Sequence, residues 1–237
     1  MKKTITFIGI VVLIIVSFIV YLVLNKPEEK EASFEEISVN DVLVEEVFKS
    51  VDAGSNYDFQ DEVYKKGTFS NQYILGLAIS HYFLDNPNTY EVNETTVDAY
   101  VKKIFGTITY AHESGYFLTS SLCKFTYDKV THSYKINTEC NHVATTNILK
   151  KRIKAYKTAT VLYVQEKIIV TENTQSYDET MSLTNVYKDI NKNDKIATVE
   201  EKEVKMDDYL EEAETYEYKF EFDGESFVFK EIKKINA

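Results

Sequence analysis

From Thr215 to Phe229 the chain reads TYEYKFEFDGESFVF, and this stretch decides the fold class. Aromatic residues alternate with charged ones on both sides of Asp223-Gly224, a pattern typical of two half-buried β-strands. Asp-Gly favours a two-residue type I′ turn. The stretch therefore predicts an antiparallel hairpin with one buried face.

The turn also predicts the register of this hairpin. We expect Phe222 to pair with Glu225, because they flank the two turn residues. Phe220 then lies opposite Phe227 on the buried face, and Lys219 points to the other face. Further back, the same register pairs Tyr218 with Phe229 and Glu217 with Lys230.

Alternation of the same kind runs through the second half of the chain. It predicts strands near residues 116–127, 134–140, 149–157, 160–170, 181–189 and 195–200, with a short acidic helix around residues 207–212. The first half instead has helical spacing, from Ser38 to Val51, from Ser70 to Leu84 and from Thr95 to Gly106. Helices followed by strands indicate an α+β fold, with three helices packed on one face of a curved antiparallel sheet.

The start of the chain differs from the rest. Lys2 and Lys3 precede an uncharged run from Ile5 to Leu24, which as a helix would measure about 30 Å, the thickness of the hydrocarbon core of a bilayer. A cleaved signal peptide would end in small residues, and the run ends without them. We therefore expect an N-terminal transmembrane helix.

The basic flank favours a cytoplasmic N-terminus. The expected organisation is a cytoplasmic tip and transmembrane anchor at residues 1–25, an acidic stalk at 26–36 and an extracytoplasmic α+β domain at 37–237. This predicts a single-pass protein of the cell membrane, with the membrane as one partner through the N-terminal helix.

The charge of the chain argues against nucleic acid as a partner. It carries 38 acidic and 27 basic residues, for a net charge of −11, and such a surface repels phosphate backbones unless basic residues are concentrated in a patch. The densest basic run is Lys150–Lys154, which contains Arg152, the single arginine of the chain. Because this run is short, we expect it to be a solvated face of one element.

Three parts of the chain carry a resemblance. Tyr100–Gly106, a cysteine-containing hairpin with Tyr127-Asp128, and the ending from Asp208 to Phe220 with Phe227–Phe229 resemble uncharacterised membrane-anchored proteins and lipoproteins of AT-rich Gram-positive bacteria. The arrangement is also similar to the cone-shaped NTF2-like fold. The resemblance covers residues 95 to 235 and implies no activity and no functional residue.

Cys123 and Cys140 form the first candidate site. If Val130–Ser133 is the tip of a hairpin, the two cysteines face one another across the strands, and a disulfide is expected in an extracytoplasmic domain. Buried free thiols, or zinc bound with His132 and His142, are the alternatives.

The remaining candidates lack a supporting pattern. His112 next to Glu113 suggests an acid–base pair, but adjacent residues of an extended segment point apart, so we expect an exposed loop. His81 is expected to be a half-buried, hydrogen-bonded residue of a helix. The run from Asn56 to Glu62 resembles a calcium loop without its glycine and closing glutamate. No cofactor, metal or catalytic residue is predicted.

Two function classes remain. The first is a non-catalytic, membrane-tethered extracytoplasmic module that binds an unknown protein, peptide or envelope component, for which a groove lined by tyrosines is a candidate site. The alternative is an enzyme with a cone-shaped pocket, in which a buried histidine or carboxylate beside tyrosines acts as general base. A deep pocket with a buried ionisable group would favour the enzyme.

Overall fold

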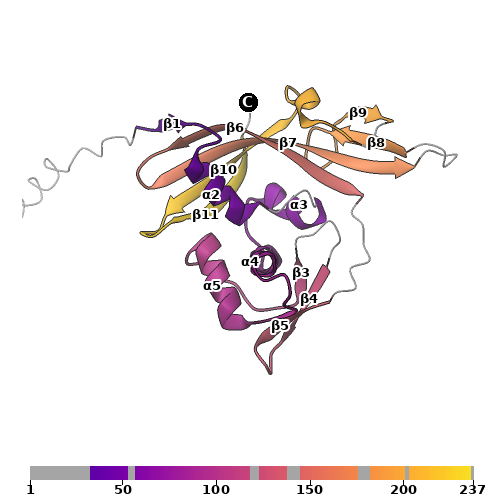
Figure 1. Ribbon diagram of the computed structural model, residues 1–237. Coiled ribbons are helices and arrows are strands. Elements are labelled where there is room, and N and C mark those ends of the chain that lie inside the picture. The colour runs from indigo at the N-terminus through magenta and orange to yellow at the C-terminus, as the bar shows by residue number, and fades with distance from the viewer. Residues whose placement is uncertain are drawn as a thin grey trace, which may run out of the picture. The chain divides into compact units, whose positions relative to one another are not determined.

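The computed structural model describes residues 33–52, 57–117, 123–137, 145–175, 182–200 and 203–235. The chain divides into two units, Met1–Ser33 and Phe34–Ala237. All the secondary structure of the described residues belongs to the second unit, which has four α-helices and two antiparallel sheets (Figure 1).

The larger sheet has seven strands and contains most of the second half of the chain. Its central order is β1 (Glu35–Ile37), β6 (Thr146–Lys157), β7 (Val161–Gln175), β10 (Glu214–Phe222) and β11 (Phe227–Ile235), with β8 (Ser182–Tyr187) paired to β7 and β9 (Lys195–Val199) paired to β8. Tyr216, Tyr218 and Phe220 lie at alternate positions of β10 and contact aromatic rings of α2 and α3, so this face of the sheet covers the helices.

The smaller sheet has four strands in the order β2 (Glu91–Asn93), β5 (Ser133–Ile136), β4 (Cys123–Asp128) and β3 (Gly115–Phe117). β2 immediately precedes a helix and pairs with β5, which follows 40 residues later. This pairing brings the start of that helix to the β4–β5 hairpin.

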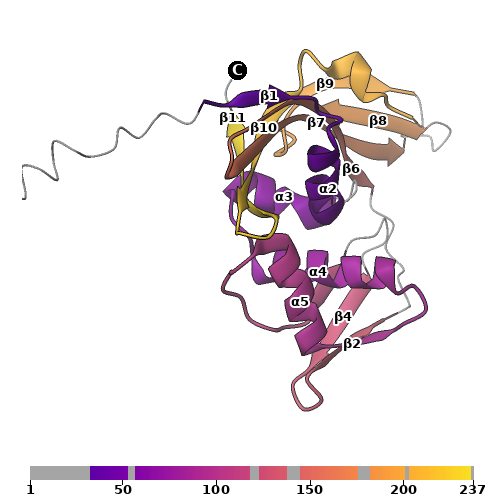
Figure 2. The same cartoon turned by 60° about the vertical axis from the view of Figure 1, so that its left-hand side comes forward.

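The helices are α2 (Val42–Val51), α3 (Tyr57–Lys66), α4 (Asn71–Asp85) and α5 (Glu94–Phe105), and a 3₁₀ turn, η1, covers Met206–Tyr209. They lie between the two sheets in both views (Figures 1 and 2). α2 buries a single stripe of apolar residues, whereas α4 is buried on nearly every side, as its place between helices and strands requires.

Aromatic rings join the helices to the larger sheet. Phe48 of α2 packs against Tyr218 and Phe220 of β10, and Phe105 at the end of α5 packs against Phe229 of β11. These side chains are buried. They form one continuous hydrophobic core beneath the larger sheet.

The predicted fold class is wrong in three respects. The described residues form two sheets rather than one, four helices rather than three, and more strand than helix. The helix without a prediction is α3, whose sequence is mostly polar. Strands were expected at residues 116–127 and 134–140, but local alternation does not indicate that they pair in a second sheet.

The predicted transmembrane helix also needs correction. No helix in the described part of the chain is long and apolar enough to cross a membrane. The run from Ile5 to Leu24, on which the prediction rested, lies outside the described residues.

The predicted disulfide is not supported either, because the described residues contain no pair of cysteines that could form it. Cys140 lies outside the described residues, and Cys123 begins β4. The β4–β5 hairpin pairs Asp128 with Ser133. Its tip is therefore one residue earlier than predicted, and the cross-strand partners in the described part of the hairpin differ by two positions from the predicted ones.

The terminal hairpin forms as predicted, but with a different turn. Phe222 pairs with Phe227 instead of Glu225, which leaves four residues in the loop. Asp223 Oδ1 accepts hydrogen bonds from the backbone N–H groups of Glu225 and Ser226, at 3.0 Å each. This side-chain cap favours the longer loop over the type I′ turn. Phe220 consequently faces Phe229.

Candidate functional site

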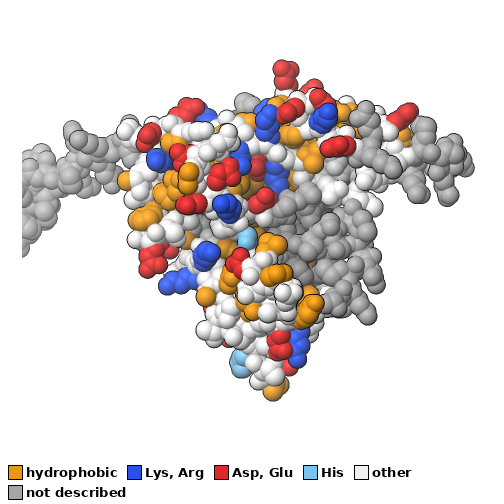
Figure 3. All heavy atoms as spheres, in the orientation of Figure 1, with side chains coloured by type: hydrophobic (Ala, Val, Ile, Leu, Met, Phe, Trp, Pro, Cys, Tyr) orange, Lys and Arg blue, Asp and Glu red, His pale blue; other side chains and the backbone are white. Residues whose placement is uncertain are grey.

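A pocket of about 790 Å³ lies between α2 and the first half of β6. The residues that line it include four basic and three acidic ones, in a chain whose net charge is −11. Figure 3 shows basic and acidic side chains gathered where α2 lies beneath the larger sheet. The charged lining residues are Glu45, Lys49, Asp52, Lys150, Lys151, Arg152 and Glu166.

The alternation of β6 determines which cations face the helices. Lys150 pairs with Ile168, and Arg152 pairs with Glu166. Both of these β7 residues are buried, so Lys150 and Arg152 share the inner face of the sheet. A bulge after Arg152 then shifts the register, and Lys154 pairs with Gln165 on the outer face.

Each inner-face cation has an acidic partner on α2 or at its end. Lys150 Nζ lies 3.2 Å from Asp52 Oδ1, and Arg152 Nη2 lies 2.8 Å from Glu45 Oε1. The Arg152 guanidinium also lies over the Phe48 ring, 5.2 Å from its centroid. Both acids are largely exposed, so a ligand can compete with them for the two cations.

Glu166 lies at the floor of the pocket and is 5% exposed. The Tyr218 hydroxyl donates a hydrogen bond to Glu166 Oε2 over 2.8 Å, and the Tyr64 hydroxyl lies 2.5 Å from that of Tyr218. Burial raises the pKa of Glu166 above that of an ordinary glutamate, and the opposing effects of Lys150 and the Tyr218 hydrogen bond do not cancel this rise.

Both tyrosines stay protonated at physiological pH. Burial and the nearby Glu166 carboxylate raise the pKa of Tyr64 and of Tyr218 well above the ordinary value. Their hydroxyls therefore remain hydrogen-bond donors beside Glu166. The pocket thus combines two cations with a buried carboxyl that accepts a hydrogen bond from Tyr218.

The outer edge of β6 adds a second feature to the pocket. In the described part of the chain, β1 pairs only with Ala155, Tyr156 and Lys157 of β6. The edge from Thr146 to Arg152 therefore carries backbone N–H and C=O groups with no partner strand among the described residues. An extended chain can add to such an edge.

Sequence reasoning found the basic run but not its role. Lys150–Lys154 was expected to be one solvated face. Instead the run divides its cations between two faces, and Lys150 and Arg152 line the pocket. Glu166 was missed because a single glutamate in an apolar strand carries no pattern. Its burial between Arg152 and Tyr216, its neighbours across the sheet, follows only from strand pairing.

The predicted zinc alternative falls partly outside the described residues, as Cys140 and His142 do. His132 lies at the tip of the β4–β5 hairpin, where it contacts Glu94. The run Asn56–Glu62, which resembles a calcium loop without its glycine and closing glutamate, belongs to α3 from Tyr57 onward, and Asp61 pairs with Lys65 on that helix.

The other two histidines differ in outcome: His81 is half-buried and hydrogen-bonded to the Ser50 backbone, as expected, whereas His112 departs from expectation. His81 lies on α4, and burial lowers its pKa. Its Nε2 is buried without a hydrogen-bond partner among the described residues. His112 does not form an exposed loop with Glu113; it lies beside Glu94 and Asp98, away from the pocket.

Comparison with protein-family models, with curated proteins and with solved structures finds no match to this chain. The resemblance to membrane-anchored proteins and to the NTF2-like fold stays a prediction. The pocket therefore has to be interpreted from its own geometry.

Proposed function

We propose that this protein is a binding module that recognises an acidic peptide segment in extended conformation, at the β6 edge and the pocket beside it. The observation that carries this proposal is the coincidence of an unpaired strand edge with two inner-face cations, Lys150 and Arg152. Backbone hydrogen bonds along the edge would supply affinity, and acidic side chains of the peptide reaching into the pocket would supply specificity.

Charge complementarity supports an acidic ligand. The chain as a whole is strongly acidic, yet the residues that line the pocket include four basic ones, among them the single arginine. A peptide carboxylate can take the place of Glu45 or Asp52 as a partner of Arg152 or Lys150. The raised pKa of Glu166 reduces the negative charge at the floor that such a carboxylate would meet.

One observation favours the enzyme as a second candidate. Glu166 is a buried carboxyl beside tyrosine hydroxyls at the floor of a pocket, the environment in which a general base is commonly tuned. The two candidates differ in the fate of the ligand, because a binding module releases its peptide unchanged.

Fluorescence anisotropy with a labelled peptide that alternates glutamate and valine tests the proposal. Lys150→Gln should weaken binding about tenfold, since a charge-assisted hydrogen bond contributes about 1.5 kcal/mol or more. Lys154→Gln removes the same charge from the same strand but on the outer face, and should bind as the parent does. A peptide with lysine in place of glutamate should not bind.

Three results would overturn this proposal. The first is equal affinity for the glutamate and lysine peptides. The second is an equal loss of peptide affinity in Lys150→Gln and Lys154→Gln. The third is the absence of saturable binding of the glutamate peptide. Mass spectrometry of the recovered peptide separates the two candidates. A cleaved or modified peptide, with the conversion lost in Glu166→Gln, would establish the enzyme instead.

A further inference from the structure

A second cluster of charged side chains lies at the start of α5, next to the smaller sheet. Asn93 caps this helix, its side chain accepting a hydrogen bond from the Thr96 N–H at 2.8 Å. Glu94 and Asp98 follow one turn apart, so their carboxylates project from the same side of the helix.

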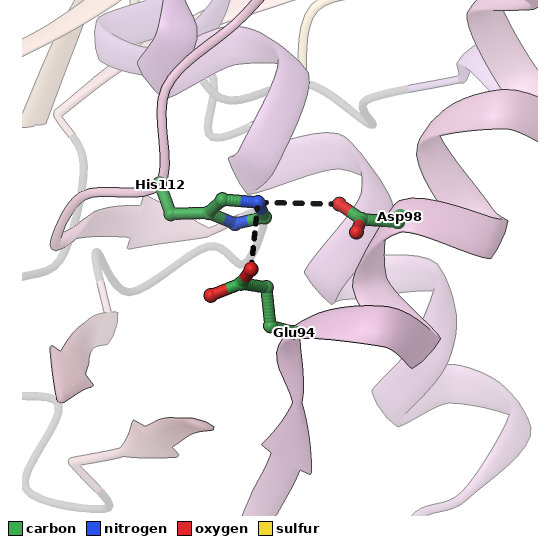
Figure 4. Close-up of side chains that lie close together, drawn as sticks. All are labelled: Glu94, Asp98 and His112. Carbon is green, nitrogen blue, oxygen red and sulfur yellow. Dashed lines mark ion pairs between the residues drawn. The ribbon is translucent and has the colours of Figure 1, made fainter. Parts of the chain in front are cut away.

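Two other segments bring histidines to these carboxylates. His112 comes from the segment between α5 and β3, and its ring lies between Glu94 and Asp98 (Figure 4). His132 comes from the tip of the β4–β5 hairpin. The pairing of β2 with β5 holds it there, and the Glu94 N–H donates a hydrogen bond to the His132 carbonyl at 2.9 Å.

The spacing of the three nearest ligand atoms suits a metal ion. His112 Nε2 lies 3.3 Å from Asp98 Oδ1 and 3.7 Å from Glu94 Oε1, and the three atoms lie within 4.8 Å of one another. Tetrahedral ligands at about 2.1 Å from zinc are separated from one another by roughly 3.4 Å. A metal ion therefore fits between these atoms with small side-chain adjustments.

Each ligand atom is oriented by an outer hydrogen-bond partner. His112 Nδ1 lies 2.6 Å from the hydroxyl of Tyr134, which is fully buried, so Nε2 is directed toward the carboxylates. The Tyr110 hydroxyl donates to Asp98, and the Tyr127 hydroxyl donates to Glu94. His132 Nδ1 also contacts Glu94, at 3.0 Å from Oε2. This arrangement, in which hydrogen bonds fix the orientation of metal ligands, is general in metalloproteins.

We propose that Glu94, Asp98 and His112 form a binding site for a divalent transition-metal cation of the zinc type. One imidazole with two carboxylates is a ligand set that favours zinc, manganese or iron over magnesium or calcium. The two carboxylates match the charge of a divalent ion. The three side chains are 21% to 46% exposed, so the ion can enter from solvent, and three protein ligands leave one position open.

The bound ion would join α5 to the segment that carries His112. The alternative is an ion pair between a protonated His112 and the carboxylates, which holds the same side chains together without a metal. The two differ in one property: the ion pair predicts no saturable binding of a metal cation at this place.

Cobalt(II) titration of the purified full chain, after treatment with a chelator, tests the site. Binding of one cobalt per chain should produce visible absorption bands typical of four- or five-coordinate cobalt, without the charge-transfer bands of thiolate ligands. The absence of those bands separates this site from one built on cysteines. Added zinc should displace the cobalt and raise the melting temperature of the chain.

Variants assign the binding to named residues. His112→Ala and Asp98→Asn should each weaken cobalt binding by more than about tenfold, and Tyr134→Phe, which removes only an orienting hydroxyl, should weaken it by about 10- to 100-fold. Glu113→Gln alters an exposed carboxylate next to His112 and should bind as the parent does.

Asp98 is 46% exposed, so its variant tests the site even if His112→Ala fails to fold. The site is overturned if the parent binds no cobalt at micromolar concentrations. It is also overturned if binding is the same in Asp98→Asn as in Glu113→Gln.

Discussion

Glu166 and Glu217 lie on adjacent strands of the larger sheet but on opposite faces, and their surroundings have opposite effects on the carboxyl. Both are buried, at 5% and 6% exposure, and both accept a hydrogen bond from a tyrosine hydroxyl. Glu166 nevertheless has a raised pKa, whereas that of Glu217 is lowered. Burial alone therefore does not decide the charge of a carboxyl group in this protein.

The difference lies in the number of donors. Burial raises the pKa of Glu217, but hydrogen bonds from Tyr156 and Gln165 and the ion pair with Lys233, at 3.3 Å, outweigh it. Among the described residues Tyr218 is the hydrogen-bond donor to Glu166. The outer-face carboxylate is thus fully partnered and structural, while the inner-face carboxyl keeps capacity for a ligand in the pocket.

The largest expected effect tests the apolar packing that desolvates the inner face. Phe220 is fully buried, and its ring packs against those of Phe48 and Phe229. Phe220→Ala should lower the free energy of unfolding by about 3 to 5 kcal/mol in urea denaturation, because it removes a ring and leaves a cavity. Phe222→Ala, on the same strand but 42% exposed, should cost less than about 1 kcal/mol. Equal costs would mean that the inner face is not packed as described.

Removing one tyrosine hydroxyl from each face of the sheet should lower the free energy of unfolding by less than Phe220→Ala does. The loss should be larger on the inner face than on the outer face. Tyr218→Phe removes the described hydrogen-bond donor to the buried carboxyl of Glu166 and one of the two partners of the Tyr64 hydroxyl, and should cost about 1 to 3 kcal/mol. Tyr156→Phe leaves Glu217 with Gln165 and Lys233, and should cost about 0.5 to 1.5 kcal/mol. Thermal or urea unfolding measures both, and a larger cost for Tyr156→Phe would reverse the comparison.

At the tip of the terminal hairpin neither face is buried. A substitution there can therefore change the free energy of unfolding only through backbone strain. Gly224 has φ of +106°, and a Cβ added there would meet no atom within 4 Å. Gly224→Val should still cost about 1 kcal/mol, because side chains resist this backbone region. Glu225→Val places the same side chain one residue later, where no positive φ is found, and should be nearly neutral. Two variants of equal stability would exclude backbone strain as the cause.

The hairpin also shows how far its sequence could predict it. The faces of Phe220 and Lys219 are as predicted, because the register differs by two residues and a two-residue shift preserves alternation. The turn itself was wrong, since the capping of two N–H groups by Asp223 is not visible in the Asp-Gly pattern. The predicted helix start at Ser70 and helix end at Gly106 were confirmed, because a capping side chain and a glycine with positive φ decide these positions locally.

Neither the pocket nor the histidine cluster could be predicted from the sequence, and the reason is the same for both. Each combines residues that are distant in the chain. Asp52 and Lys150 are 98 residues apart, and Glu94 and His132 are 38 apart. Local periodicity carries no information on such pairs. They depend on the pairing of β6 with β7 and of β2 with β5, which forms only in the folded chain.

The pH dependence of stability tests the contrast between the two carboxyl groups most directly. A raised pKa in the folded state means that Glu166 destabilises the fold as pH rises from below the ordinary glutamate pKa through its folded value. A lowered pKa means that Glu217 stabilises the fold above the ordinary value and that this contribution is lost as pH falls through its folded pKa.

Urea unfolding of the parent, Glu166→Gln and Glu217→Gln from about pH 3 to about pH 8 therefore gives a clear expectation. As pH rises, the stability of Glu166→Gln relative to the parent should increase, and that of Glu217→Gln relative to the parent should decrease. If both differences change in the same direction with pH, or neither changes, the two carboxyl groups do not differ in the way that their surroundings indicate.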